Sequence, residues 1–309
     1  MGCTTFTGRS AGVGLRDKIG QAAQSLARAG IDSAALDAEV LLSYALGLRR
    51  EQLILRADSL LSAEQTDCFA ALLRRRRRRE PMAYIIGRQE FWSLDFQVSP
   101  NVLIPRPESE RLVEVALTLA AQAASTKPLR VLDLGTGSGA IAVSLATEIP
   151  AAEIIATDIS PTALAVARQN ARINGVAERI EFRCGDLIDA LTDQTAPFDL
   201  ILSNPPYIRR AEFAALAPEV SVYEPRAALD GGADGLDFYR RIAAGAWRFL
   251  AANGALALEI GADMGHEVCA VLDHSGRYQK VVVLQDYAAR DRVAVGQSRL
   301  GPACSGLGM

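Results

Sequence analysis

The sequence predicts an α/β protein in which a doubly wound, mostly parallel sheet follows a small N-terminal helical bundle and a short hairpin. From residue 129 onward, short apolar runs alternate with helical stretches, as strands and helices do along a parallel sheet. Residues 15–84 instead show helical periodicity and contain no convincing strand. The chain has 309 residues, half of them apolar, which is enough for a large and a small domain with separate cores.

The N-terminal stretch divides into three predicted helical segments. Ala22, Leu26 and Ala29 share one face of the first segment, and Ser33 is placed to cap the second. The third segment opens at Ser62, a residue type that favours this position because its side-chain oxygen accepts a backbone N–H. We therefore expect a helical bundle.

A short aromatic region follows the helical stretch. Apolar and polar side chains alternate over 94–98, which indicates a hairpin, and two prolines come soon after at 105 and 107. We interpret this region as a packed linker between two domains. The expected organisation is a flexible N-terminus (1–14), a helical domain (15–84), a hairpin linker (85–108), a Rossmann-like domain (109–297) and a flexible tail (298–309).

The remainder of the chain supplies six candidate strands. They are 130–134, 153–157, 180–182, 198–202, 255–260 and 280–284. The first, fourth and fifth of these are near-continuously apolar, as strands covered by helices on both faces tend to be.

The charge balance and the cysteines exclude several classes of protein. A formal net charge of −3, from 33 basic and 36 acidic residues, gives no field that attracts nucleic acid or an anionic membrane. The five cysteines form no C-x-x-C pair, so neither a zinc site nor a disulfide framework is expected. No apolar run reaches the roughly 18 residues that span a bilayer. We expect a cytoplasmic monomer with no metal and no membrane or nucleic-acid partner.

A glycine-rich loop, residues 133–140, follows the first candidate strand. Glycines let the chain turn sharply and let a ligand approach the backbone. Gly135, Gly137 and Ala140 satisfy a dinucleotide-binding pattern, and Asp158 ends the second strand where a carboxylate can accept hydrogen bonds from ribose hydroxyls. A dinucleotide, a nucleoside methyl donor and a purely structural turn all remain open on this pattern.

Asp133 favours the methyl donor. This carboxylate would repel a pyrophosphate but not the cationic sulfonium and ammonium groups of S-adenosylmethionine. Two further candidates follow the third strand, where an adenine-contacting residue often falls. We therefore predict S-adenosylmethionine as the cofactor, held by Asp133, Gly135, Thr136, Gly137, Ser138, Gly139, Asp158, Asp186, Leu187 and Asn204.

The fourth strand runs into Asn204-Pro205-Pro206-Tyr207. Two consecutive prolines remove two N–H donors and stiffen the backbone. An amide nitrogen is a poor nucleophile, but if the Asn204 side-chain oxygen and the Pro205 carbonyl each accept one N–H, its lone pair is aimed at the methyl group. Tyr207 is expected to pack against the planar amide. No metal or general base is needed.

Other interpretations of this tetrapeptide remain open. Its acceptors also suit an exocyclic amine of a nucleic acid, adenine N6 or guanine N2. A dinucleotide-dependent oxidoreductase would leave residues 204–207 without a role, and asparagine and proline are also common in structural turns.

With these residues identified, the chain resembles the peptide-chain release factor N(5)-glutamine methyltransferases. The stretches that carry the resemblance are 80–81, 84–87, 102–110, 133–140, 204–208, 223–226, 229–232, 235–237 and 291–293. Two positions depart from the family pattern: Glu108-Ser109 stands where the family has Asp-Thr, and Leu187 stands where it often has an aromatic residue. The final residues 301–309 match nothing in the family pattern.

The resemblance implies an S-adenosylmethionine-dependent protein-(glutamine-N5) methyltransferase with a seven-stranded methyltransferase sheet. The implied partner is a class I release factor, methylated on the glutamine of its Gly-Gly-Gln motif and recognised by the helical domain. The implied substrate-binding residues are Asn204, Pro205, Pro206, Tyr207, Arg106 and Glu108, of which Asn204, Pro205 and Tyr207 are catalytic.

A run of six arginines, residues 74–79, ends the third helical segment. Six like charges cannot share one helix face. We interpret the run as a solvated helix end, with a basic patch for an acidic release-factor surface or RNA as the alternative.

Overall fold

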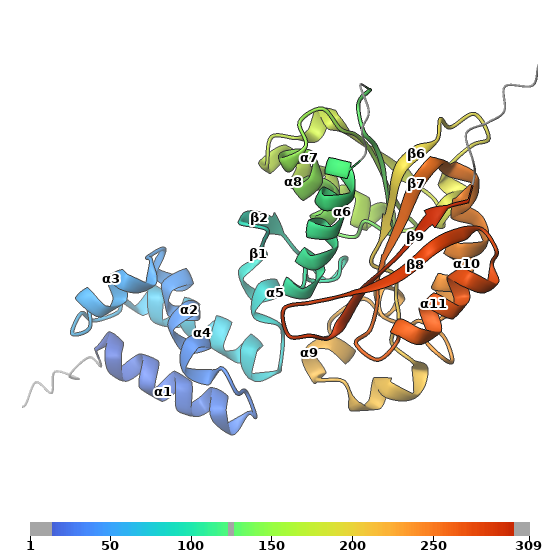
Figure 1. Cartoon of the computed structure of the whole chain (residues 1–309). Helices are drawn as coiled ribbons and strands as arrows, with labels where there is room; N and C mark the ends of the chain where they lie inside the picture. Colours follow the sequence, from blue (N-terminus) through green and yellow to red (C-terminus); the bar gives the residue numbers. More distant parts are fainter. Residues whose placement is uncertain (1–13, 123–126, 300–309) are drawn as a thin grey trace, which may run out of the picture. The chain divides into compact units, whose positions relative to one another are not determined.

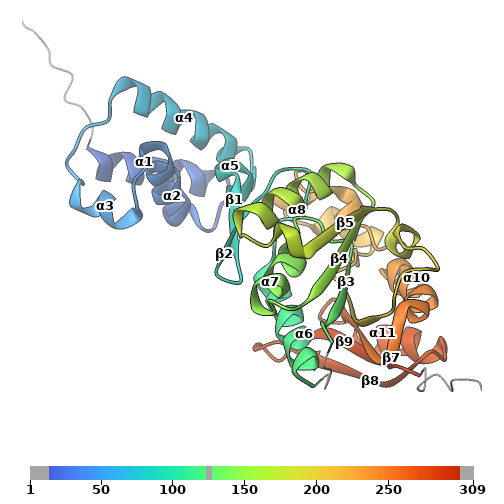
Figure 2. The ribbon, with the colours of Figure 1, turned by 90° about the horizontal axis from the view of Figure 1, so that it is seen from above.

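A computed structural model describes residues 14–122 and 127–299 of the chain. The predicted flexible ends therefore lie, apart from residues 14, 298 and 299, outside the described residues. The chain forms two compact units, Met1–Ile86 and Gly87–Met309 (Figure 1, Figure 2). None of the helices in the described ranges is both long and apolar enough to cross a membrane.

The first unit is a bundle of helices around one apolar core. Leu26, Leu41 and Leu42 are fully buried there and pack with Phe69. Ser62 caps the fourth helix as predicted, accepting a hydrogen bond from the Gln65 N–H (3.1 Å). Ser33 occupies the N-cap position of α2, as predicted, but its side chain makes no such hydrogen bond. The helices are α1 (Leu15–Arg28), α2 (Ala34–Leu46), α3 (Arg50–Leu55), α4 (Ala63–Arg77) and α5 (Met82–Ile86).

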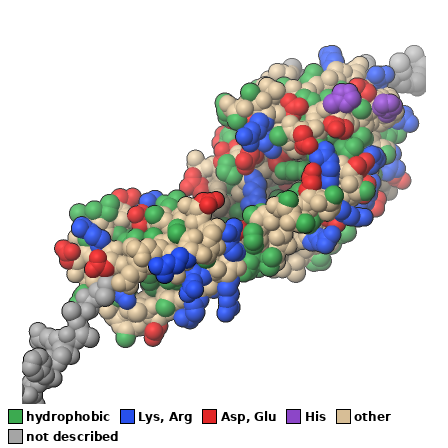
Figure 3. Space-filling model, turned by 90° about the horizontal axis from the view of Figure 1, so that it is seen from below, with side chains coloured by type: hydrophobic (Ala, Val, Ile, Leu, Met, Phe, Trp, Pro, Cys, Tyr) green, Lys and Arg blue, Asp and Glu red, His purple; other side chains and the backbone are tan. Residues whose placement is uncertain are grey.

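The arginine run combines structural and exposed side chains. Arg75 pairs with Glu80 (2.5 Å), and Arg79 donates to the Gly30 carbonyl (2.5 Å). Others in the run lie at the surface, and basic side chains gather on the face of this unit seen in Figure 3. A hollow of about 370 Å³ is lined by Ser25, Arg28, Ala29, Arg74, Arg77 and Arg78. The run is therefore only partly a solvated helix end.

Arg76 joins two helices across the core of this unit. Its Nε donates to Asp37 Oδ2 at 2.7 Å, with both side chains 7% exposed. Removing one partner of a buried ion pair leaves the other charge unpaired, so Arg76→Ala should destabilise the protein by about 3–5 kcal/mol. Urea unfolding followed by circular dichroism would measure this change.

Two further variants make that test specific. Arg77→Ala removes an exposed neighbour of the same helix and should change the free energy of unfolding by at most about 0.5 kcal/mol. Arg76→Met combined with Asp37→Leu removes both charges and should recover most of the loss. An Arg76→Ala protein as stable as the parent would contradict the structural role of this pair.

The second unit begins with an antiparallel hairpin, β1 (Arg88–Phe91) and β2 (Leu94–Gln97). Trp92 and Ser93 form its turn with φ of 53° and 56°. Phe91 and Phe96 meet edge to face, 6.0 Å between ring centroids, and are buried in the core of this unit. The hairpin predicted within 85–108 thus packs as part of the α/β unit.

The main sheet has seven strands in the order β5-β4-β3-β6-β7-β9-β8. Six of them run in one direction, and β9 runs in the opposite direction. This confirms the predicted α/β fold with a mostly parallel sheet. The strands are β3 (Arg130–Leu134), β4 (Glu153–Asp158), β5 (Ile180–Cys184), β6 (Phe198–Ser203), β7 (Leu250–Glu259), β8 (Tyr278–Gln285) and β9 (Asp291–Ser298).

Helices cover both faces of the sheet and close two apolar cores. The first face carries α6, α7 and α8, and the second carries α10 and α11 (Figure 1, Figure 2). The helices are α6 (Glu110–Gln122), α7 (Ala140–Glu148), α8 (Pro161–Ile173), α9 (Pro218–Ser221), α10 (Asp237–Gly245) and α11 (Gly265–His274). The 3-10 turns are η1 (Pro107–Ser109), η2 (Ala177–Arg179), η3 (Leu187–Ala190), η4 (Arg210–Ala215), η5 (Arg226–Ala228) and η6 (Ala246–Phe249).

The strand order reverses between β3 and β6, which are parallel neighbours. In open α/β sheets, ligands bind outside the carboxyl ends of the strands at such a switch point. Leu134 at the end of β3 pairs with Thr157 of β4 and with Ser203 of β6. The glycine loop, Asp158 and Asn204 consequently lie together at the carboxyl ends of these parallel strands.

Candidate active site

A cavity of about 790 Å³, here called the switch-point cavity, opens at that edge. Among the predicted site residues, its wall contains Gly135, Gly137, Asp158, Asp186, Leu187, Asn204, Pro205 and Pro206. The wall does not contain Asp133, Thr136, Ser138, Gly139, Tyr207, Arg106 and Glu108. The topology thus brings together the main candidates from four separate strand ends.

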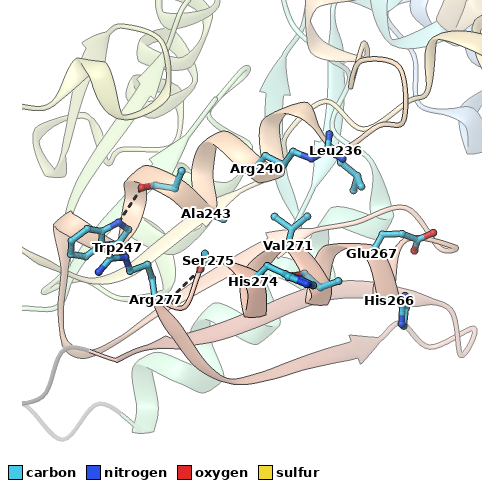
Figure 4. Close-up of a pocket in the computed structure, with 12 residues that line it drawn as sticks. Leu236, Arg240, Ala243, Trp247, His266, Glu267, Val271, His274, Ser275 and Arg277 are labelled. Carbon is cyan, nitrogen blue, oxygen red and sulfur yellow. Dashed lines mark hydrogen bonds between the residues drawn. The ribbon is translucent and has the colours of Figure 1, made fainter.

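A second hollow of about 870 Å³ lies between α10 and α11 (Figure 4). Arg277 stacks over the Trp247 ring there, 4.1 Å from its centroid. The wall of this hollow includes no residue of the glycine loop or of 204–207. Although it is larger, it lacks the convergent backbone and polar groups of the switch-point cavity, so we place the candidate site in the latter.

The glycine loop has the backbone that its sequence requires. Gly137 adopts φ of 57° and has no atom within 4 Å of the position that a Cβ would occupy. Gly139 adopts φ of 82°, and a Cβ there would come within 3.1 Å of the Ala167 Cβ on α8. One glycine thus leaves room at the cavity, while the other lets α8 pack closely.

Asp158 is held in place by backbone donors. Its Oδ2 accepts the Gly137 N–H at 2.8 Å, and its Oδ1 accepts the Ser160 N–H at 2.8 Å. A carboxylate has about four lone-pair sites, so acceptor capacity remains for a ligand. The half-buried side chain lines the cavity and can accept hydroxyl hydrogens there.

Asp133 lies behind the cavity wall and is fully buried. Burial raises the pKa of its carboxyl to about 7, although the Thr136 hydroxyl, which donates to Oδ2 at 2.6 Å, opposes the rise. Oδ1 has no hydrogen-bond partner of normal geometry among the described residues, although the Ala142 N–H lies close enough to lower the pKa. A buried acid with an unused acceptor favours a cationic group nearby, because such a group would stabilise its ionised form.

Asn204 is anchored through its amide nitrogen. Nδ2 donates to the Ser109 Oγ at 3.0 Å, while Ser203 before it donates its hydroxyl to the Leu134 carbonyl at 2.7 Å. Since the nitrogen of the Asn204 amide is engaged away from the cavity, its Oδ1 is the atom left to accept hydrogens. This leaves an acceptor on the cavity side of the strand end.

Tyr207 is half-buried at the end of the Asn-Pro-Pro-Tyr segment. Its ring packs against the apolar core beneath α10 and does not line the cavity. Burial raises the pKa of the Tyr207 phenol to about 12, with a further contribution from the Glu259 charge. The phenol therefore stays protonated near neutral pH and cannot act as a base there.

Arg106 belongs to an ion pair in which the carboxylate is buried and the guanidinium is partly exposed. Its guanidinium contacts Glu224, whose Oε2 also accepts the Ile104 N–H at 3.3 Å. Burial raises the pKa of the Glu224 carboxyl, and the Arg106 charge opposes that rise. Glu108 is exposed and outside the cavity wall. Arg106 thus fixes the segment that carries Ser109 to the segment around Pro225, which lines the cavity.

Sequence reasoning missed Glu259, the last residue of β7. Its side chain is buried behind Asn204, and residue exposure is 1%. Burial raises the pKa of the Glu259 carboxyl to about 7, while the Ser109 hydroxyl and the Asn204 amide lower it as hydrogen-bond donors. Oε2 nevertheless has no partner of normal geometry in the described part of the chain. The sequence feature that could have revealed Glu259 is its position as a single acidic residue near the end of an otherwise apolar strand, residues 255–260.

No cluster of three or more His, Cys, Asp or Glu side chains suited to a metal occurs within 14–122 and 127–299. The chemistry of the cavity wall is instead that of backbone donors, carboxylates and amide acceptors.

Comparisons with known proteins agree with this geometry. Residues 18–87 match the family model of the PrmC N-terminal domain, and residues 112–235 match that of the methyltransferase small domain. Release factor glutamine methyltransferase from Cereibacter sphaeroides is 47% identical over 277 residues, 90% of this chain and 96% of that protein. The protein of the same name from Geobacter sulfurreducens is 46% identical over 272 residues, 88% of this chain and 92% of its own length.

Among solved structures, the catalytic domain of hMettl16 in complex with a MAT2A 3'UTR hairpin is similar with a TM-score of 0.54. The match covers 70% of this chain and 81% of that one at 18% sequence identity. At that identity the likeness shows the fold alone.

Proposed function

The chain belongs to the release factor glutamine methyltransferase family, and from that premise we propose how its cavity works and which groups it binds. The protein is an enzyme that methylates glutamine in release factors. We propose that the methyl donor is S-adenosylmethionine and that the acceptor is the side-chain amide nitrogen of the glutamine in the Gly-Gly-Gln motif of class I release factors.

The cavity residues fit this donor. When bound, S-adenosylmethionine supplies a methyl group on a cationic sulfur. Asp158 has acceptor capacity for ribose hydroxyls, and the open space at Gly137 allows close approach to the backbone. The unused oxygen of Asp133 favours a cationic ligand. Asp186 and Leu187 also line the cavity, and we propose that they contact the adenine of the donor. We propose that Thr136, Ser138 and Gly139 support the donor by shaping the loop.

The chain's own contribution to catalysis is to orient the substrate amide. Asn204 Oδ1 and the Pro205 carbonyl each accept one N–H of the glutamine side chain, which leaves the nitrogen lone pair for the methyl group. The methylated nitrogen carries a positive charge and is strongly acidic, so it loses its proton to water without a dedicated base. Pro206 stiffens this corner, and Tyr207 anchors it in the core. Arg106 and Glu108 are proposed to contact the substrate at the mouth.

Other parts of the proposal concern the rest of the chain. We propose that the helical domain, 15–84, recognises the release factor and that the hairpin linker, 85–108, joins it to the donor-binding domain, 109–297. We propose that the protein acts as a monomer, which is supported by a cavity wall whose residues all come from one α/β unit. Release factors act in translation, so we place the reaction in the cytoplasm.

One observation carries the proposed function: Asn204, Pro205 and Pro206 share a cavity with the glycine loop and Asp158. Incubation with labelled S-adenosylmethionine and a release factor, followed by mass spectrometry, should place one methyl group on the Gly-Gly-Gln glutamine. A parallel reaction with DNA should remain unlabelled. Label in DNA alone, or a release factor labelled at another residue, would overturn the proposal.

Asp158→Asn should weaken binding of S-adenosylmethionine. Hydrogen bonds to a charged group contribute about 1.5–3 kcal/mol, so the Kd should rise by about 10- to 100-fold. Titration calorimetry measures this change, and Glu153→Gln at the exposed start of the same strand is the control. An unchanged Kd would exclude Asp158 from the donor site.

A further inference from the structure

Glu259 is a buried carboxylate that the proposed chemistry has not yet used. Glu259 is the last residue of β7. The residue before it, Leu258, pairs with Ser203 of the neighbouring parallel strand, so Glu259 and Asn204 leave their strands side by side. At 1% exposure Glu259 is not part of the wall of the switch-point cavity. Burying an ionisable group without a full set of partners is costly, so a retained acid here calls for a physical explanation.

Ser109 connects this carboxylate to Asn204. The Ser109 Oγ accepts a hydrogen bond from Asn204 Nδ2 at 3.0 Å. A hydroxyl has a single proton, and with Oγ engaged as an acceptor that proton is free for another oxygen. The Glu259 carboxylate is the acidic neighbour toward which Ser109 donates. Asn204 therefore donates to Ser109, and the Ser109 hydroxyl and the Asn204 amide both act as donors toward Glu259.

We propose that Glu259 is a positioning residue that, both directly and through Ser109, holds the Asn204 side chain with its Oδ1 toward the switch-point cavity. This inference rests on the proposed function, in which that oxygen accepts an N–H of the substrate glutamine. The charge of Glu259 is what selects the orientation, because the nitrogen and oxygen of an amide have nearly the same shape.

The alternative orientation shows why the charge matters. If the Asn204 amide were flipped, Oδ1 would face Ser109 and would need the Ser109 proton. An ionised Glu259 draws that proton to itself, so the flipped amide oxygen would meet only lone pairs. A carboxylate at the end of the chain also polarises the bonds before it and makes Oδ1 a stronger acceptor. A neutral side chain at 259 removes both effects.

The orientation should therefore depend on pH, and the surrounding charges set the range. Burial raises the pKa of the Glu259 carboxyl to about 7, and the Glu108 charge of η1 acts in the same direction. Arg292 on β9 lowers that pKa but is itself paired with Asp286 at 3.1 Å. Tyr207 and Tyr239, both raised in pKa by burial, remain neutral. Activity should rise with pH as Glu259 ionises and should fall below about 7.

The test compares Glu259→Gln and Glu259→Asp with the parent protein between pH 5.5 and 9. The measured quantity is kcat for release-factor methylation at saturating S-adenosylmethionine, because Asp133, also with a pKa of about 7, can affect donor binding in the same range. Glu259→Gln should lower kcat by about 10- to 100-fold and lose the acid limb, with an unchanged donor Kd. Glu259→Asp keeps the charge and should keep the acid limb.

Ser109→Ala provides an independent variant, since it removes one of the two donors that join Asn204 to the carboxylate and leaves Glu259 itself unaltered. It should lower kcat and flatten the pH profile as Glu259→Gln does. A Glu259→Gln protein with parental kcat and the parental acid limb would overturn the inference. The inference would also fail if Glu259→Gln lost both donor binding and its native circular dichroism while Ser109→Ala kept the parental kcat and pH profile. A parent protein that leaves release factors unmethylated would instead reject the proposed function itself.

Discussion

Replacing Asn204 by alanine is expected to lower kcat for glutamine methylation by about 10²- to 10³-fold, the usual cost of losing one preorganised hydrogen-bonding group at a reacting centre. The Asn204 amide is anchored by Ser109 and leaves Oδ1 to hold the substrate N–H. Alanine removes that acceptor, so the substrate nitrogen is no longer aligned with the methyl group. Single-turnover measurements at saturating donor would isolate this loss from product release.

Two variants sharpen this experiment. Asn204→Asp keeps the shape but brings a second carboxylate beside Glu259 and cannot donate to Ser109, so its kcat should also be low. Gln122→Ala removes an exposed carboxamide from the end of α6 and should leave kcat near the parental value. Normal turnover by Asn204→Ala would show that the Asn-Pro-Pro-Tyr corner does not hold the substrate amide.

The switch-point cavity could be anticipated from the sequence because parallel strands bring their carboxyl ends to one edge. Asp158 and Asn204 each follow an apolar strand directly, so the alternation of strands and helices was enough to place them together. The same reasoning could not place Glu259 beside Asn204. That contact depends on the register between β6 and β7, which the spacing of apolar residues does not encode.

Long-range pairing also explains the other differences. The strand β9 was not predicted, since Arg292 and Gly296 interrupt its apolar pattern although the chain is buried there between β7 and β8. In the sequence Arg76 could not be distinguished from the other five arginines of the run. Only the fold brings it to Asp37, 39 residues earlier. Tyr207 was expected to pack against the substrate amide, which stays a prediction; its partly buried side chain packs against the core that α10 covers.

The loop that supports this corner provides a second, distinct way to perturb catalysis. Ile208 donates its N–H to the Leu229 carbonyl at 2.9 Å, and Gly231 donates to the Ile208 carbonyl at 3.0 Å. A Cβ at Gly231 would lie 2.6 Å from the Tyr207 Cα and 2.7 Å from its carbonyl carbon. These are backbone atoms, so no side-chain rotation can relieve the clash.

Gly231→Ala should therefore displace the Pro206–Tyr207 backbone and lower kcat by about 10²-fold, because misplacement of about 1 Å costs that much at a reacting centre. The donor Kd should stay unchanged, since Gly137 and Asp158 leave the sheet from other strands. Gly276→Ala is the control for backbone strain without a clash: it forces alanine into positive φ, at 66°, which Gly231 does not adopt, and it meets no atom within 4 Å. That control should lose about 1 kcal/mol of stability and keep its kcat. If both glycine variants lost stability equally and both retained turnover, the position of the diproline corner could not be what determines the rate.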